Sequence, residues 1–174
     1  MGAQAQERRI VRVVVCDTGP VLHLFEAHAL GLLEKTGEVL IPPNVDDEIA
    51  RHVQDWRSRR PGWLRVESPR HPLAAQLGQS AAQIDLGAGE MEAIVLATSR
   101  AADWLLTDDA GARIVATLLG MEAHGSLGVV LWAAAQAHID RHEAAAILDR
   151  LAAASLWISP AILAEARRAL DVLP

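Results

Sequence analysis

The sequence contains a single cysteine among its 174 residues. One cysteine cannot form a disulfide within the chain, so a disulfide-rich secreted fold is excluded and a reducing cytoplasm is the expected location. Long hydrophobic runs are also lacking. The longest uncharged stretches, 125–139 and 151–164, fall short of the roughly 18 residues that a membrane span requires. Residues 1–9 lack the apolar core of a secretory signal and are expected to be a loose N-terminus.

An excess of basic charge is lacking too. The net charge is −6, which excludes a broadly basic nucleic-acid binder. Lys35 is the only lysine, which disfavours a phospho-receiver domain, since that fold uses a lysine late in the chain. The arginines, however, gather in residues 51–70, where Asp55 and Glu67 are the only acids. This segment is either a solvated face or a contact for a phosphate backbone or an acidic partner. Its members are Arg51, Arg57, Arg59, Arg60, Arg65 and Arg70.

About half of the residues are hydrophobic and no low-complexity tract interrupts them, so residues 1–174 are expected to form one folded domain. Apolar, β-branched segments alternate with segments of helical spacing. Crossover helices between strands make a sheet parallel, so the expected fold is α/β, with three α/β/α layers and a central, mostly parallel, twisted sheet. The predicted strands are 13–16, 38–41, 63–66, 103–107 and 121–124, with 156–159 as a further strand or an extended link. The predicted helices are 20–35, 44–56, 71–82, 90–102, 110–119, 129–138, 141–153 and 160–170. Asn44 and Asp140 are the expected N-caps of two of these helices.

Carboxylates stand at the ends of two predicted strands. Asp17 follows strand 13–16, and Asp108 and Asp109 follow strand 103–107. In a doubly wound sheet the carboxyl ends of the strands share one rim, which is where ligands bind. Acids gathered there repel one another and raise each other's pKa, and a hard divalent cation such as Mg²⁺ or Mn²⁺ relieves that repulsion. Each aspartate could instead simply cap the helix that follows it, although Thr18 could take the place of Asp17 in that role.

Three glutamates are candidates to complete such a site. Glu48 lies in the first turns of the helix after the second strand, where it could instead pair with Arg51 or His52. Glu90 and Glu92 are two residues apart on a helix and therefore about 200° apart around it. They cannot both face one ion, so one of them is expected at the surface.

Three short segments resemble the PIN domain, the nuclease fold of VapC-type toxins, and in particular the PIN-like branch of predicted nucleic-acid-binding proteins. The first is an apolar strand followed by Asp-Thr-Gly-Pro-Val, at residues 15–21. The second is Gly-Glu-Met-Glu-Ala-Ile-Val-Leu-Ala, at residues 89–97. The third is Leu-Leu-Thr-Asp-Asp followed by Ala-Gly-Ala-Arg, at residues 105–113. The likeness covers roughly residues 11–135, and the helices of 129–174 are less covered.

The resemblance implies a role for each matching acid. Asp17 is then the first metal ligand and Glu48 the second catalytic acid. Glu92 stands where many PIN domains carry aspartate, and Asp109 falls at the aspartate of a Thr-x-Asp pattern, with Asp108 beside it as the other possible ligand. The implied metal ligands are thus Asp17, Glu92 and Asp109 or Asp108. Thr18 and Thr107 are the implied polar support.

The resemblance also implies an activity, which is metal-dependent endonucleolytic hydrolysis of RNA with Mg²⁺ or Mn²⁺. On this assignment Glu92→Gln should reduce activity more than Glu90→Gln. The expected biological role is the toxin of a type II toxin–antitoxin pair, a homodimer blocked by a small antitoxin protein. A catalytically weak PIN-like module that binds nucleic acid or protein is the alternative. The candidate RNA contacts are Arg51, Arg57, Arg59, Arg60 and Arg113.

Overall fold

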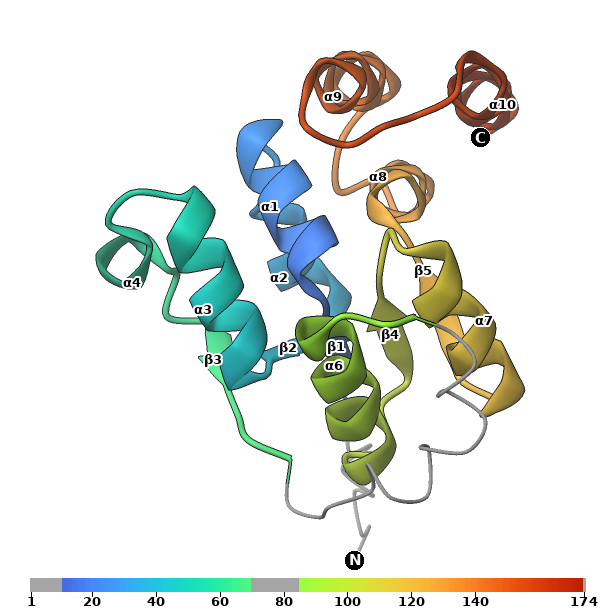
Figure 1. Cartoon of the computed structure of the whole chain (residues 1–174). Coiled ribbons are helices and arrows are strands. Elements are labelled where there is room, and N and C mark those ends of the chain that lie inside the picture. Colours follow the sequence, from blue (N-terminus) through green and yellow to red (C-terminus); the bar gives the residue numbers. More distant parts are fainter. Residues whose placement is uncertain (1–10, 70–84, 174) are drawn as a thin grey trace, which may run out of the picture.

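A five-stranded parallel sheet forms the centre of the molecule (Figure 1), in a computed structural model that describes residues 11–69 and 85–173. The strand order is β3-β2-β1-β4-β5, and every neighbouring pair is parallel. This confirms the predicted α/β fold and its parallel sheet. The strands are β1 (Val13–Cys16), β2 (Glu38–Ile41), β3 (Leu64–Val66), β4 (Trp104–Leu106) and β5 (Glu122–His124).

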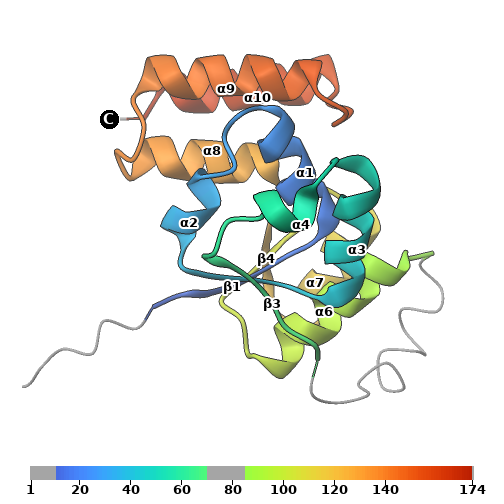
Figure 2. The same cartoon turned by 90° about the vertical axis from the view of Figure 1, so that its left-hand side faces the viewer.

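Helices cover both faces of this sheet, giving three α/β/α layers (Figure 2). Side chains of a strand alternate between the faces. Val14 and Cys16 therefore pack into the larger core, beneath α1, α2, α3 and α8, while Val15 packs on the other face against α6 and α7. The helices before β3 are α1 (Thr18–Glu26), α2 (Leu32–Thr36), α3 (Pro43–His52) and α4 (Trp56–Arg59). Those after it are α6 (Ala88–Ser99), α7 (Ala110–Leu118), α8 (Ser126–Ala135), α9 (Arg141–Ala153) and α10 (Pro160–Asp171).

Several predicted helix boundaries are corrected. The helix expected over 20–35 is two helices, α1 and α2, separated at His28, whose φ is 54°. Asn44 is not an N-cap, because α3 begins at Pro43 with Pro42 in the capping position. The same helix does not reach Trp56, since a left-handed Asp55 (φ 56°) starts the separate helix α4.

The C-terminal third is a layer of helices packed over α1 (Figures 1 and 2). α8 begins at Ser126, three residues before the predicted start, whereas Asp140 caps α9 as predicted. Residues 156–159 form a link between α9 and α10 rather than a strand. The helix predicted over 71–82 and the loose end at 1–9 lie outside the described residues. Among the described helices, none has the length and apolar character needed to span a bilayer.

Candidate active site

Asp17 is the first residue after the central strand and caps the N-terminus of α1. Its backbone N–H donates to the last carbonyl of β4 at 2.9 Å. Its Oδ1 accepts from the Thr18 amide at 2.7 Å, and its Oδ2 accepts from the Thr107 hydroxyl at 2.9 Å. Burial raises the pKa of Asp17 to about 6, against the lowering effect of these two hydrogen bonds, and the charges of Glu90 and Glu48 raise it further. A buried carboxyl is thus held at the sheet rim with other acids close enough to act on it.

Glu48 projects from α3 toward the start of α6. Its Oε2 accepts from the Thr18 hydroxyl at 2.5 Å, and it does not pair with Arg51 or His52. A side chain at Gly89 would place its Cβ 2.5 Å from that same Oε2, so the glycine makes room for the carboxylate. Glu48 therefore bridges α1 and α6 at the rim.

Glu90 and Glu92 leave α6 in different directions, as their spacing predicts. Glu90 lies in the first turn, and its carboxylate caps the helix by accepting from the Gly87 amide. Burial raises the pKa of Glu90, and the charges of Asp109 and Glu48 add to that effect. Glu92 instead faces α3, where its Oε2 accepts from the Asn44 amide at 2.7 Å. Both glutamates thus hold a helix-terminal amide, but Glu90 is the one whose charge acts on Asp17.

Asp108 and Asp109 are adjacent in sequence but have separate surroundings. Asp109 is exposed and caps α7, with its Oδ1 accepting from the Ala112 amide at 2.7 Å. Asp108 turns the other way. Its Oδ2 lies 2.7 Å from His23 Nδ1 and accepts from the Ser126 hydroxyl at 2.5 Å, while its Oδ1 accepts from the Ser126 amide at 2.7 Å. Burial alone would raise the pKa of Asp108, but these hydrogen bonds outweigh it and hold the pKa below its usual range. Asp108 therefore joins α1 to the start of α8.

Four acids from different parts of the chain consequently influence one another at the rim: Asp17, Glu48, Glu90 and Asp109. Carboxylate oxygens are the ligands that hard divalent cations prefer, so this donor set suits Mg²⁺ or Mn²⁺. In residues 11–69 and 85–173, however, no three histidine, cysteine, aspartate or glutamate side chains form a ready-made metal-binding group. The acids share a region, and each is held by a hydrogen bond within the protein.

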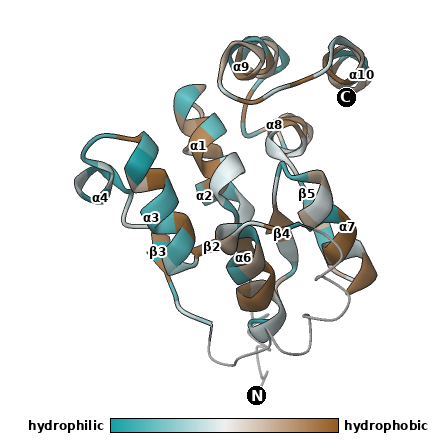
Figure 3. Cartoon of the chain, in the orientation of Figure 1, coloured by the Kyte–Doolittle hydropathy of each residue, from teal (hydrophilic) through white to brown (hydrophobic). Residues whose placement is uncertain are grey.

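The arginine segment is largely neutralised by nearby acids. Arg57 binds Asp47 at 2.5 Å, and Arg60 binds the buried Asp46 at 2.7 Å. Arg59 lies over the Phe25 ring, 4.8 Å from its centroid. Figure 3 colours much of the α3 ribbon as hydrophilic, with hydrophobic positions between. Within the described part of the chain, Arg51 has no acidic partner, and Arg65 pairs with Glu38.

Two residues at the rim were not anticipated from the sequence. His23 and Ser126 both bind Asp108, although they lie 85 and 18 residues from it in the chain. Ser126 lacks a nearby base in the sequence, and His23 lies in an apolar helix. The Gly-Ser pair that starts α8 directly after a predicted strand is the local signal that could have pointed to Ser126.

The parallel strand order and the acids gathered at the strand ends define an α/β protein with an acidic rim at the carboxyl ends of its strands. A family model described as "DUF3368: PIN domain" matches residues 13–171. The chain therefore belongs to the PIN domain family, whose members are generally nucleases that use divalent metal ions. No curated protein and no solved structure matches the chain.

Proposed function

We propose that this protein is a metal-dependent endoribonuclease that hydrolyses the phosphodiester bonds of RNA. The observation that carries the proposal is the burial of Asp17 among other rim acids: burial raises the pKa of Asp17 to about 6, and the charges of Glu90 and Glu48 add to that rise. Several carboxylates held together at the end of a sheet destabilise each other's charged form. Such an arrangement costs stability unless a cation compensates it, so its presence favours a cation-dependent function.

Asp17, Glu48 and Asp109 are the proposed metal ligands and catalytic acids, together with one glutamate of α6. When bound, Mg²⁺ or Mn²⁺ supplies a water of lowered pKa and neutralises charge that develops on the phosphate. Thr107 orients Asp17 by donating to its Oδ2, and the Thr18 hydroxyl orients Glu48.

Asp108 is proposed to act as a positioning residue. Its carboxylate is already bound by His23 and by both donors of Ser126. These contacts fix the β4–α7 junction and thereby the backbone that carries Asp109. Asp109, rather than Asp108, is therefore the proposed ligand from this pair.

RNA binding at an acidic rim needs nearby cations. Arg113 is the best candidate, because it lies on α7 in the turn after Asp109 and donates to the Thr107 carbonyl at 3.2 Å. Arg51 is a second candidate. Arg57 and Arg60 are weaker ones because acids neutralise them, and Arg59 is weaker because it lies over the Phe25 ring.

The proposed biological role is the toxin of a type II toxin–antitoxin pair, acting in the cytoplasm as a homodimer that a small antitoxin protein inhibits. This role rests on the likeness to VapC-type toxins. Growth arrest on expression, relieved by a small protein encoded beside this chain, supports the role; unimpeded growth with active enzyme contradicts it.

A catalytically weak PIN-like binding module is the second candidate. It is favoured by the hydrogen bonds that occupy the acids, namely Thr18 to Glu48, Gly87 to Glu90 and Ala112 to Asp109. Such a module would retain RNA or a protein partner and leave RNA intact.

Cleavage of a labelled RNA with Mg²⁺ or Mn²⁺ separates the two candidates. The endoribonuclease cuts the RNA, loses activity in EDTA and loses it in Asp17→Asn. Activity that persists in EDTA or in Asp17→Asn contradicts the metal-dependent mechanism. An intact RNA that is shifted in a gel identifies the binding module. An equivalent DNA strand tests the preference for RNA.

A further inference from the structure

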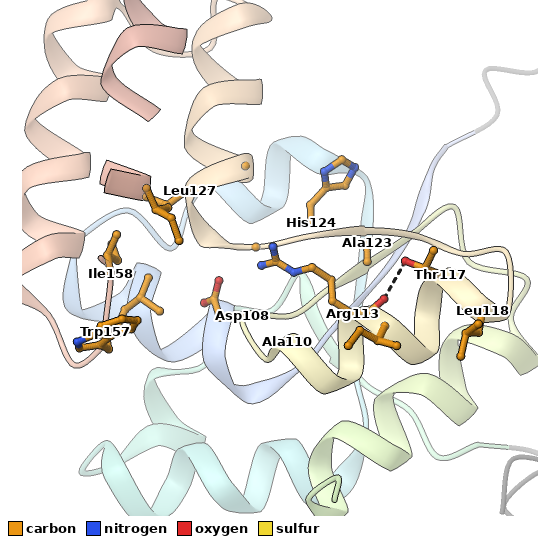
Figure 4. Close-up of a pocket in the computed structure, with 15 residues that line it drawn as sticks. Asp108, Ala110, Arg113, Thr117, Leu118, Ala123, His124, Leu127, Trp157 and Ile158 are labelled. Atoms are coloured by element: carbon orange, nitrogen blue, oxygen red, sulfur yellow. Dashed lines mark hydrogen bonds between the residues drawn. The ribbon is translucent and has the colours of Figure 1, made fainter. Parts of the chain in front are cut away.

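A groove of about 840 Å³ lies beside the acidic rim. One wall is formed by α7, β5 and the start of α8, and the other by the link after α9 and the first turn of α10 (Figure 4). Asp108 and Arg113 line the groove, so the groove and the acids share the β4–α7 junction. Most of its other lining residues are apolar; they include Ile114, Leu118, Leu127, Leu156, Ile158 and Ile162.

Trp157 is the most exposed aromatic side chain at this groove, with 83% of its surface accessible to solvent. Its neighbours Leu156 and Ile158 pack against the core, so the chain anchors both sides of the tryptophan and leaves the indole outside. Large aromatic rings are usually buried or used to bind a partner. Because it lies on an otherwise apolar groove, the exposed indole offers a flat face on which a ligand can stack.

Arg113 supplies positive charge within the groove. Figure 4 shows its side chain extending between His124 and Asp108. Its guanidinium packs against Gly125, where a Cβ would lie 2.5 Å from Nη2, so the glycine leaves space for it. A guanidinium next to an acidic site can hold a phosphate that the acids alone would repel.

We infer that this groove is a subsite for a nucleotide of single-stranded RNA, with a base stacked on Trp157 and a backbone phosphate at Arg113. The inference rests on the proposed nuclease function and adds the path that the RNA follows away from the acidic rim. The groove opens from the β4–α7 junction, where Asp108 and Arg113 line it, so an RNA strand whose phosphate reaches Asp17 and Asp109 can continue into the groove. Its volume lies within the range of sites that hold small organic ligands. An amphipathic peptide would use the apolar walls equally, but the continuity with the acidic rim favours RNA.

Fluorescence anisotropy of a fluorescein-labelled single-stranded RNA decamer tests the subsite. Asp17→Asn is the background, so that the RNA stays intact, and Mg²⁺ is present. Stacking of one base on an aromatic ring predicts that Trp157→Leu weakens affinity about 5- to 140-fold. Trp157→Phe, which keeps a ring, should retain most of the affinity. Val172→Ala is the matched control, since Val172 is 82% exposed and lies outside the groove.

Two further measurements assign the loss to the base and to the phosphate. In a series of decamers, a single abasic ribose replaces each nucleotide in turn. The protein that keeps Trp157 should bind more weakly when the abasic site lies at one or two particular positions. The Trp157→Leu variant should bind these RNAs as well as it binds the intact decamer. Arg113→Gln should lower the slope of log affinity against log salt by about 0.7, the contribution of one phosphate on a single strand.

The outcomes separate the subsite from the nuclease proposal. If the protein with Asp17 intact cuts RNA but Trp157→Leu changes neither the affinity nor the abasic profile, the subsite is wrong and the nuclease proposal stands. If the protein neither binds nor cuts RNA, both are wrong. If sedimentation detects a dimer that Trp157→Leu dissociates while RNA affinity is unchanged, the groove is a protein interface and the nucleotide assignment is overturned.

Discussion

Replacing Asp17 with asparagine should stabilise the metal-free protein at neutral pH. The pKa of Asp17 rises from 3.8 to about 6 on folding, so the native state binds the proton more tightly than the unfolded chain. That contribution to stability is complete below pH 3.8 and is lost as the pH rises through 6. A difference of about 2 pKa units corresponds to about 3 kcal/mol. The asparagine side chain carries no charge and avoids this penalty, while it keeps the shape of the aspartate that it replaces.

Urea unfolding with and without metal measures the effect. Without metal at pH 7.5, Asp17→Asn should be more stable by up to about 3 kcal/mol, equivalent to about 6–12 °C in Tm for a chain of this size. The gap should shrink as the pH falls toward 4. Saturating Mn²⁺ should stabilise the wild type, by about 2.7 kcal/mol at a hundredfold excess over Kd, and leave Asp17→Asn unchanged. A substitution that destabilises the metal-free protein at pH 7.5 would refute the account of a buried, mutually repelling acid cluster.

Two matched pairs test the other acids. Asp108→Asn should lower the free energy of unfolding by about 1–3 kcal/mol, because it weakens the contacts with His23 and Ser126, and should keep the metal-induced rise in Tm. Asp109→Asn should leave the free energy of unfolding nearly unchanged, since asparagine also caps a helix, but should abolish the metal-induced rise in Tm, since asparagine carries no charge for a cation. If thermal denaturation shows that Asp108→Asn loses the metal-induced rise and Asp109→Asn keeps it, Asp108 is the ligand. In the RNA cleavage assay, Glu90→Gln should lower kcat more than Glu92→Gln, because the charge of Glu90 acts on Asp17. A larger loss for Glu92→Gln would restore the assignment made from the sequence resemblance.

The parallel sheet could be predicted because its strands are short, apolar and bounded by clear breaks. Val13–Cys16 consists of three β-branched valines and a cysteine and is followed by the charged Asp17, and Glu38–Ile41 is followed by two prolines. Those same prolines explain the misplaced cap. Proline suits the first helical position, so Pro43 begins α3 and moves the cap from Asn44 to Pro42.

The convergence of acids could be anticipated from strand order, but the direction of each side chain could not. Which glutamate of α6 faces Asp17 depends on the rotation of the helix about its axis, which the contact between Glu92 and Asn44 and the close fit of Gly89 against Glu48 fix. Asp108 is the positioning residue and Asp109 the proposed ligand because Asp108 binds partners that are distant in the sequence, above all His23 on α1.

The charge of the arginine segment could not be judged from the sequence alone. Counted along the sequence, residues 51–70 are basic. In the fold, the turn between α3 and α4 brings Arg57 and Arg60 back onto Asp46 and Asp47, which precede the segment. A local charge count therefore overstates the positive surface that this region offers to RNA.

We propose that carboxylates far apart in the sequence meet at the sheet rim and hold a divalent cation. Electron paramagnetic resonance of Mn²⁺ titrated with the protein tests it most directly, because bound Mn²⁺ loses the signal of the free ion. The account predicts that the wild type binds Mn²⁺ and that Asp17→Asn and Asp109→Asn each abolish or sharply weaken this binding. Equal binding by all three proteins, or none by the wild type, would contradict it.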